Sequence, residues 1–165
     1  MKKLNVFIIL VVILSILLIG CSDKYEEWKT VSILGGGTIK VPQDWVVTQE
    51  DNVMYITDKP INEEGYKIYL VGTVFDDKNS NNYLLPYKLF ENVELIGEVN
   101  TVNYSNSGMY GIEEYDISGN IETRYIIHLY HTTNTSNFIA WDNLLDEDMI
   151  IKITKSYVPS VDADK

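Results

Sequence analysis

An apolar stretch near the N-terminus divides this sequence of 165 residues into two unequal parts. Residues 4–19 are apolar except for Asn5 and Ser15, and they follow the basic pair Lys2 and Lys3. As a helix the stretch would be about 24 Å long, at roughly 1.5 Å per residue, whereas a bilayer core is about 30 Å thick. Its length and its basic flank therefore indicate a secretory signal segment rather than a membrane span.

The apolar stretch ends at Leu18-Ile19-Gly20-Cys21, which contains the only cysteine in the sequence. This motif resembles the lipobox of bacterial lipoproteins. The resemblance implies signal cleavage between Gly20 and Cys21 and a diacylglyceryl thioether on Cys21. Two acyl chains anchor a protein stably, whereas one holds only marginally. We therefore expect residues 1–20 to be removed and the mature protein to be held on the extracytoplasmic face of the cell membrane; an uncleaved signal anchor is the alternative.

The remaining 145 residues suit a single domain. We place a lipidated tether at residues 21–29, the domain at residues 30–158 and a short tail at residues 159–165, and we expect a monomer. With Cys21 committed to the lipid, no thiol is left for a disulfide or for a metal site. Residues 22–29 could extend over about 26–29 Å, at 3.3–3.6 Å per residue.

The charge of the domain limits its partners. Without Lys2 and Lys3 the chain has 11 basic residues against 24 acidic ones, a net charge of about −13. Nucleic acid needs a basic surface, so we exclude it as a partner. Anionic lipid would repel the acidic body, although screening limits this repulsion to about 8–10 Å. The negative charge favours partners with a basic surface. The alternative interpretation is that it only keeps the protein soluble.

Short strand-like segments alternate with turn residues, which predicts a mostly antiparallel sheet. One segment is apolar on both alternating faces and predicts a strand covered on both sides. That segment is residues 66–75. The other expected strands are residues 30–34, 38–41, 45–48, 53–57, 95–104, 109–117, 121–130 and 137–141.

Two helices are expected beside this sheet. A short one runs from Pro86 to about residue 92, and a longer one begins near Leu145 and ends before Pro159. The longer helix has acidic residues at its start and lysines later, which suits the helix dipole. Its apolar stripe comprises Leu145, Met149, Ile150, Ile153 and Tyr157.

Three places in this order of elements resemble the PsbP-like family, which includes the extrinsic photosystem II subunit and bacterial lipoproteins. They are residues 38–45 (TIKVPQDW, with its P-x-x-W), the strand at residues 66–75, and residues 150–157 (IIKITKSY). The resemblance covers about residues 28–158. It implies an α+β fold in which an antiparallel sheet is sandwiched between helices, with the C-terminal helix packed on the sheet. It implies binding of a partner and carries over no catalytic residues.

The candidate metal-binding residues do not match known metal-binding motifs. His128 and His131 are three residues apart in an expected strand, so their side chains point to opposite faces and suit one metal ion poorly. Asp77-x-Asn79-x-Asn81 resembles the start of an EF-hand loop, but Asn82 and Lys88 stand where that loop requires Gly and Glu. The acidic residues Asp142 and Asp146 to Asp148 are explained more simply as helix N-terminal charge. We expect no metal and no cofactor.

Catalytic motifs are also missing from the sequence. Gly35-Gly36-Gly37 is not followed by Gly-Lys-Ser or Gly-Lys-Thr, so it predicts a turn rather than a phosphate loop. No Gly-x-Ser-x-Gly elbow occurs. Carboxylates are so frequent in this chain that pairs of them indicate nothing. We therefore predict a protein that is not an enzyme and has no catalytic residues.

The aromatic residues leave two binding hypotheses open. Trp45 and Trp141 are the expected core anchors among 12 tyrosines and three tryptophans, with Trp28 at the edge of the fold. Our leading hypothesis is a non-catalytic adaptor lipoprotein that binds an envelope protein with a basic surface. The alternative is a lipoprotein that binds a small ligand or a glycan, and an enzyme of unrecognised type is a third class. A flat, exposed, apolar and acidic patch would favour the first hypothesis, and a cleft of converging tyrosines the second.

Overall fold

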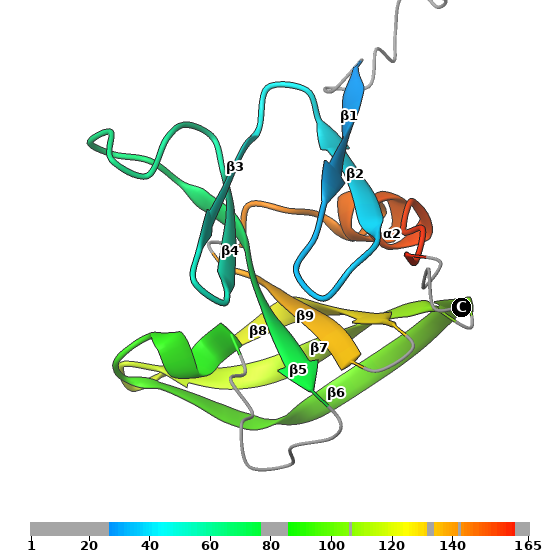
Figure 1. Cartoon of the computed structure of the whole chain (residues 1–165). Coiled ribbons are helices and arrows are strands. Elements are labelled where there is room, and N and C mark those ends of the chain that lie inside the picture. The colour runs from blue at the N-terminus through cyan, green and yellow to red at the C-terminus, as the bar shows by residue number, and fades with distance from the viewer. Residues whose placement is uncertain (1–26, 77–85, 106, 132–133, 142, 161–165) are drawn as a thin grey trace, which may run out of the picture.

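The computed structural model describes residues 27–76, 86–105, 107–131, 134–141 and 143–160 (Figure 1). The predictions for Gly20 and Cys21, for the segment from Asp77 to Asn82, and for Asp142 lie outside these residues. No helix within the described ranges is long and apolar enough to cross a bilayer. The elements are β1 Trp28–Ser32, β2 Thr38–Pro42, β3 Val46–Glu50, β4 Val53–Thr57, β5 Ile68–Asp76, the 3-10 turn η1 Pro86–Leu89, β6 Val93–Ser105, β7 Gly108–Ile117, β8 Asn120–Tyr130, β9 Asn134–Ala140 and α2 Glu147–Lys155.

A seven-stranded antiparallel sheet with the order β3-β4-β5-β9-β8-β7-β6 forms the centre of the fold, and β1 and β2 form a separate hairpin. The hairpin and α2 pack on one face of the sheet, which we call the helix face, and η1 packs on the other, which we call the η1 face (Figure 1). The predicted antiparallel sheet with a C-terminal helix packed on it is therefore confirmed.

β5 shows why the sheet is covered on both faces. Its neighbouring residues Leu70 and Val71 are both fully buried, and because side chains alternate along a strand they enter different cores. Leu70 packs with Ile127, Phe138 and the α2 residue Ile150, whereas Val71 lies in the core on the η1 face. The prediction that this segment is a doubly covered strand is confirmed.

Several tight turns of the fold use left-handed backbone. Asp51 in the β3–β4 turn and Ser118-Gly119 in the β7–β8 turn all have positive φ angles. Asp and Gly tolerate this left-handed conformation, which tight hairpin turns require. Gly35, Gly36 and Gly37 also have positive φ angles and connect β1 to β2. The glycine triplet is a turn, as predicted.

α2 is capped at both ends by side chains. Asp146 is the N-cap, and its carboxylate accepts a hydrogen bond of 2.9 Å from the Met149 N–H. At the other end the Ser156 hydroxyl donates to the Ile153 carbonyl and accepts from the Lys40 N–H of β2. After Lys155 the chain turns away, and Val158 forms an isolated bridge with Thr38 of β2. The helix therefore ends four residues before Pro159.

Two sequence predictions need correction. The helix expected from Pro86 to about residue 92 is only a 3-10 turn over Pro86–Leu89, and Asn92 with its positive φ angle lies in the turn that leads into β6. In the part of the chain that the structure describes, the η1 face therefore lacks the α-helix that a sandwich with helices on both faces would have. The first described strand, β1, begins at Trp28, two residues before the strand expected at residues 30–34.

The tryptophans are divided between buried and half-buried positions. Trp45 is 1% exposed and stacks on Tyr69 at a ring-centroid distance of 4.2 Å, which confirms it as a core anchor. Trp141 is half-buried and stacks on Phe90 at 3.6 Å on the η1 face. Trp28 packs against the core of the helix face from β1.

Candidate functional site

Part of the helix face is left uncovered by α2. In the β6–β7–β8 register, Asp116 lies opposite Glu94 and Ile121, Glu114 lies opposite Thr123, and Ile112 lies opposite Tyr125. Directly opposed residues point to the same face of a sheet. Because Tyr110, two residues before Ile112, lies in the core under α2, all these side chains are on the helix face. We call this region the open sheet face and define it as Glu94, Ile112, Glu114, Asp116, Ile121, Thr123 and Tyr125.

The open sheet face combines exposed aliphatic surface with carboxylates. Ile121 is 62% exposed, Glu94 and Thr123 are exposed, and the other four side chains are half-buried. None of the seven residues is basic. An isoleucine this exposed would gain free energy by leaving water for an apolar partner, and the carboxylates near it select the sign of that partner's charge.

The N-terminus of α2 adds further negative charge at the border of this face. The Tyr110 hydroxyl donates a hydrogen bond of 2.5 Å to Oε1 of Glu147, which fixes the first turn of α2 against β7. Burial, and next the negative charges of Glu147 and Asp146, raise the pKa of Tyr125 above its ordinary value. The same carboxylates would attract a cationic side chain placed over Tyr125.

A hollow of about 420 Å³ lies at the end of the open sheet face, beside the β7–β8 turn. Two backbone-directed hydrogen bonds shape it: the Ser118 N–H donates to the Asn92 carbonyl at 2.8 Å, and the Gly119 N–H donates to Oδ1 of Asp116 at 2.7 Å. Carboxylates and small residues surround it, which suits the head of a lysine or an arginine. Its lining residues are Asn92, Val93, Glu94, Asp116, Ser118 and Gly119.

The two histidines lie on opposite sides of the sheet, as predicted from their spacing. His128 is on the η1 face, where its Nδ1 donates to Oδ1 of Asn137 at 2.5 Å. His131 follows β8 and lies 2.6 Å from the Tyr157 hydroxyl through Nδ1, beside the helix face. They cannot share a metal ion, and the described residues contain no group of three or more His, Cys, Asp or Glu side chains that could hold one.

His131 and Ser136 are close enough to resemble a base and its nucleophile, with 2.7 Å between Nε2 and Oγ. The serine hydroxyl, however, donates its single proton to the Leu34 carbonyl. Nε2 must then be the donor to Oγ, so it cannot take the serine proton. Ser136 is also fully buried. The pair therefore joins the glycine turn to β9 and is not a catalytic pair.

The glycine turn is packed directly against this pair. A Cβ atom on Gly35 would lie 3.0–3.1 Å from Oδ1 of Asn134, Nε2 of His131 and Oγ of Ser136. The adjoining Tyr157 hydroxyl also donates to the Tyr130 carbonyl at 3.1 Å, and burial raises the pKa of Tyr157 to about 12. The sequence predicted the turn but not this close approach, because the contacting residues are about a hundred positions away.

A buried carboxyl on the η1 face was missed by the sequence reasoning. Glu113 is 9% exposed, and its Oε2 accepts a hydrogen bond from the Tyr115 hydroxyl. Burial, and to a smaller extent the charge of Glu98, raise the pKa of Glu113, while the Tyr115 hydrogen bond and His128 lower it. The available signal was a glutamate on the same strand face as the apolar residues Tyr115 and Ile117, where burial is expected.

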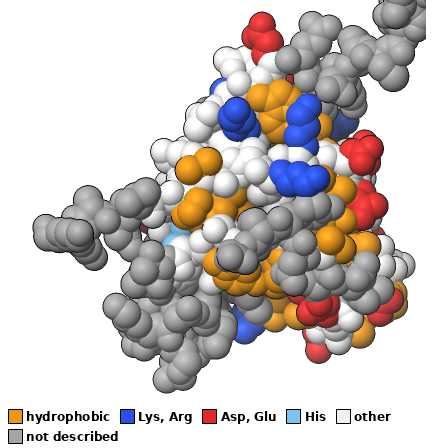
Figure 2. Space-filling model, turned by 90° about the vertical axis from the view of Figure 1, so that its right-hand side faces the viewer, with side chains coloured by type: hydrophobic (Ala, Val, Ile, Leu, Met, Phe, Trp, Pro, Cys, Tyr) orange, Lys and Arg blue, Asp and Glu red, His pale blue; other side chains and the backbone are white. Residues whose placement is uncertain are grey.

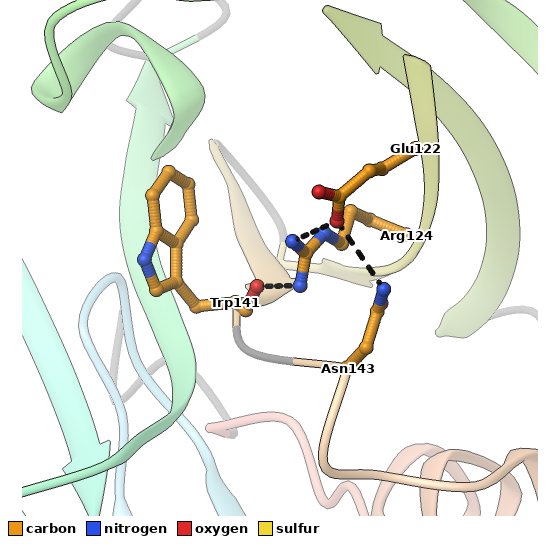
Figure 3. Close-up of polar contacts among 4 residues, drawn as sticks. All are labelled: Glu122, Arg124, Trp141 and Asn143. Carbon is orange, nitrogen blue, oxygen red and sulfur yellow. Dashed lines mark hydrogen bonds and ion pairs between the residues drawn. The ribbon is translucent and has the colours of Figure 1, made fainter. Parts of the chain in front are cut away.

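The only arginine of the sequence lies opposite Glu113 but does not pair with it. Arg124 is 9% exposed, and its guanidinium donates to the Trp141 carbonyl and to Oε2 of Glu122 (Figure 3). Asn143 donates to the same oxygen at 3.5 Å (Figure 3). Arg124 thus fastens β8 to the chain that follows β9, which is a structural role.

No protein-family model matches the chain, and no curated protein is significantly similar to it.

Proposed function

We propose that this protein is a lipid-anchored extracytoplasmic lipoprotein whose domain binds an envelope protein and catalyses no reaction. The open sheet face is the binding surface, and its partner presents a basic and aliphatic surface. The observation that carries the proposal is the 62% exposure of Ile121 on a face where Glu94, Glu114 and Asp116 supply carboxylates and none of the seven defining residues is basic.

Physical reasons support a protein as the partner. An open sheet face offers area rather than enclosure, and small molecules bind best where most of their surface is buried. Exposed aliphatic surface supplies affinity, whereas complementary charge speeds encounter and rejects acidic proteins. The N-terminal lipobox, which would hold Cys21 at the membrane, would restrict the search for such a partner to the envelope.

The PsbP-like relationship is part of the proposal. It is supported by the position of the P-x-x-W motif, in which Pro42 ends β2 and Trp45 is buried under the hairpin, and by the α2 segment that packs on the sheet. The glycan or small-ligand alternative is less well supported, because the hollow beside the open sheet face has no tyrosine among its lining residues.

The binding proposal is tested by neutralising the open sheet face. The triple variant Glu94→Gln, Glu114→Gln and Asp116→Asn removes three charges and keeps side-chain size, and Asn at position 116 still accepts from the Gly119 N–H. The matched control changes the exposed Glu63, Glu64 and Glu91 to Gln. Both variants and the unaltered chain would be crosslinked in the source envelope at low and high salt.

We expect one partner that is captured by the unaltered chain and by the control, is lost at high salt, and is lost from the triple variant. Ile121→Thr should weaken the same capture without changing its salt dependence. Equal capture by the triple variant would show that the open sheet face is not the binding surface.

The anchoring proposal has its own test, which is Cys21→Ala. We expect loss of membrane retention and a change of mobility on a gel, because the variant cannot carry the lipid. Unchanged retention and mobility would refute the lipoprotein assignment and leave the binding face to be judged separately.

A further inference from the structure

Lysines gather at one end of the molecule although the chain as a whole is acidic. Figure 2 shows several Lys and Arg side chains together on the upper part of one face, around an apolar side chain; Asp and Glu side chains lie at the very top, to the right and below, and one more Lys or Arg lies near the bottom. Four of the seven lysines in the described ranges belong to the hairpin or to the last turns of α2. With Trp28 they form what we call the basic pole, defined as Trp28, Lys29, Lys40, Lys152 and Lys155.

Contacts of Trp28 and Lys40 join the hairpin to the C-terminal end of α2. Nζ of Lys152 lies 4.4 Å from the ring centroid of Trp28, and Lys29 donates to the carbonyl of Trp45, which follows β2. The Lys40 N–H donates to Oγ of Ser156, the residue that follows Lys155. α2 therefore brings its C-terminal lysines against the hairpin. The helix dipole accounts for the two lysines of α2 but not for the two on the strands.

The basic pole and the open sheet face carry opposite charge in different parts of the fold. The exposed carboxylates Glu27 and Asp44 also belong to the hairpin segment, so the pole has a small positive net charge, whereas the mature chain is close to −13. The hairpin stands above the sheet in Figure 1, and the β7–β8 turn beside the open sheet face lies at the lower left. The charge of this domain is thus polarised, which the sequence total conceals.

We propose that the basic pole lies against an anionic lipid bilayer and orients the domain so that the open sheet face points away from the membrane. This inference rests on the lipid anchor of the proposed function. Residues 22–27 span at most about 20–22 Å, at 3.3–3.6 Å per residue, so β1 is the element that the anchor keeps nearest to the membrane. Electrostatic attraction acts within about 8–10 Å at ordinary salt, which favours the pole nearest to the anchor.

The side chains of the basic pole suit a headgroup region. Lysines can lay their methylene chains along apolar surface while the ammonium groups contact phosphate, and tryptophan favours the interface between lipid and water. The half-buried Trp28 has one side against the core and Lys152 over its ring. The acidic remainder of the domain is repelled by the same anionic surface, so attraction and repulsion favour the same orientation.

The orientation can be measured by quenching Trp28 fluorescence with brominated lipids. The protein extracted from its own membrane in detergent would be reconstituted in vesicles of phosphatidylcholine, with or without an equal amount of phosphatidylglycerol. Trp28→Phe gives the background from Trp45 and Trp141. The test variant Lys40→Gln, Lys152→Gln and Lys155→Gln is compared with a control of equal charge, in which Lys59, Lys67 and Lys88 become Gln.

We expect quenching of Trp28 to be about twofold or more stronger in the anionic vesicles, since each lysine near an anionic surface contributes appreciably to attraction. The difference should disappear at about 1 M salt, where electrostatic attraction reaches only roughly 3 Å. It should also disappear in the test variant but persist in the control variant. Equal quenching in both lipids, or equal loss in both variants, would overturn the proposal.

Sedimentation with the vesicles separates this inference from the lipid anchor on which it rests. An anchored protein sediments with vesicles of either composition whatever its orientation. Sedimentation without a difference in quenching overturns only the orientation, whereas failure to sediment with neutral vesicles overturns the anchor.

Discussion

Gly72 offers a direct test of how the helix-face core is packed. It lies in β5 opposite Phe138 of β9, and its φ angle is not positive, so its backbone conformation is open to any residue. A Cβ atom added there would lie 2.8 Å from Cζ of the Phe138 ring and closer still to Cδ1 and Cε1. Phe138 is 1% exposed and packed in the core of the helix face. We therefore expect Gly72→Ala to strain the core.

The magnitude follows from two opposing effects. Replacing Gly by Ala at a compatible position stabilises a protein by about 0.4–1 kcal/mol through the unfolded chain. Overpacking a close-packed core costs about 1–3 kcal/mol. We expect Gly72→Ala to lower the free energy of unfolding by about 1–2 kcal/mol, which corresponds to roughly 2–4 °C in Tm per kcal/mol for a domain of this size.

Gly97 in β6 is the matched control, because no atom lies within 4 Å of a Cβ built on it and its φ angle is not positive either. Gly97→Ala should be neutral or stabilising, by up to about 1 kcal/mol. Urea unfolding of both variants measures the contrast. The double variant Gly72→Ala with Phe138→Leu should lose less stability than the two single variants lose together. Equal effects at Gly72 and Gly97 would refute the packing argument.

Three further predictions concern charged side chains. Burial raises the pKa of Glu113, so its contribution to stability is fully present below the ordinary Glu pKa and is lost as pH rises through the folded-state value. Glu113→Gln should therefore unfold at higher denaturant concentration than the unaltered chain at neutral pH, and the gain should shrink towards acid pH. Asp146→Ala removes the N-cap of α2 and should cost about 0.5–2 kcal/mol in urea unfolding, whereas Asp146→Asn should cost less. Arg124→Lys cannot reach both the Trp141 carbonyl and Glu122, and should lower the free energy of unfolding by about 1–3 kcal/mol.

Each of these predictions has an outcome that contradicts it. A gain for Glu113→Gln that is constant with pH would mean that the carboxyl is not desolvated in the folded state. Identical stabilities of the Ala and Asn variants at position 146 would argue against the capping hydrogen bond to Met149. A stability of Arg124→Lys equal to that of the unaltered chain would show that the forked geometry contributes nothing.

Much of the fold follows from local patterns. The turns at Asp51 and Ser118-Gly119 need left-handed backbone, and the residues that tolerate it stand there in the sequence. β5 was identifiable because apolar residues occupy both of its alternating faces. The 3-10 turn at Pro86 was overestimated as a helix, since apolar spacing over so few residues does not report the positive φ angle of Asn92.

The candidate site was less accessible to sequence reasoning. The seven residues of the open sheet face come from three strands, and their common face depends on register. β6 shifts its register in three places, including between Leu95 and Gly97, so a count along β6 alone would misplace its later side chains. Where α2 stops covering the sheet is also set by packing, through Tyr110 and Glu147, and not by any motif.

By itself the sequence determined the antiparallel class of the sheet, its turns, the C-terminal helix and the acidic total charge, because these depend on neighbouring residues or on composition. Only the tertiary structure decided how that charge is distributed. Pairing across strands collects Glu94, Glu114 and Asp116 on one open face, and docking of α2 on the hairpin brings Lys152 beside Trp28. A net charge is a sum over residues, whereas a binding surface and an orientation depend on where the chain places them.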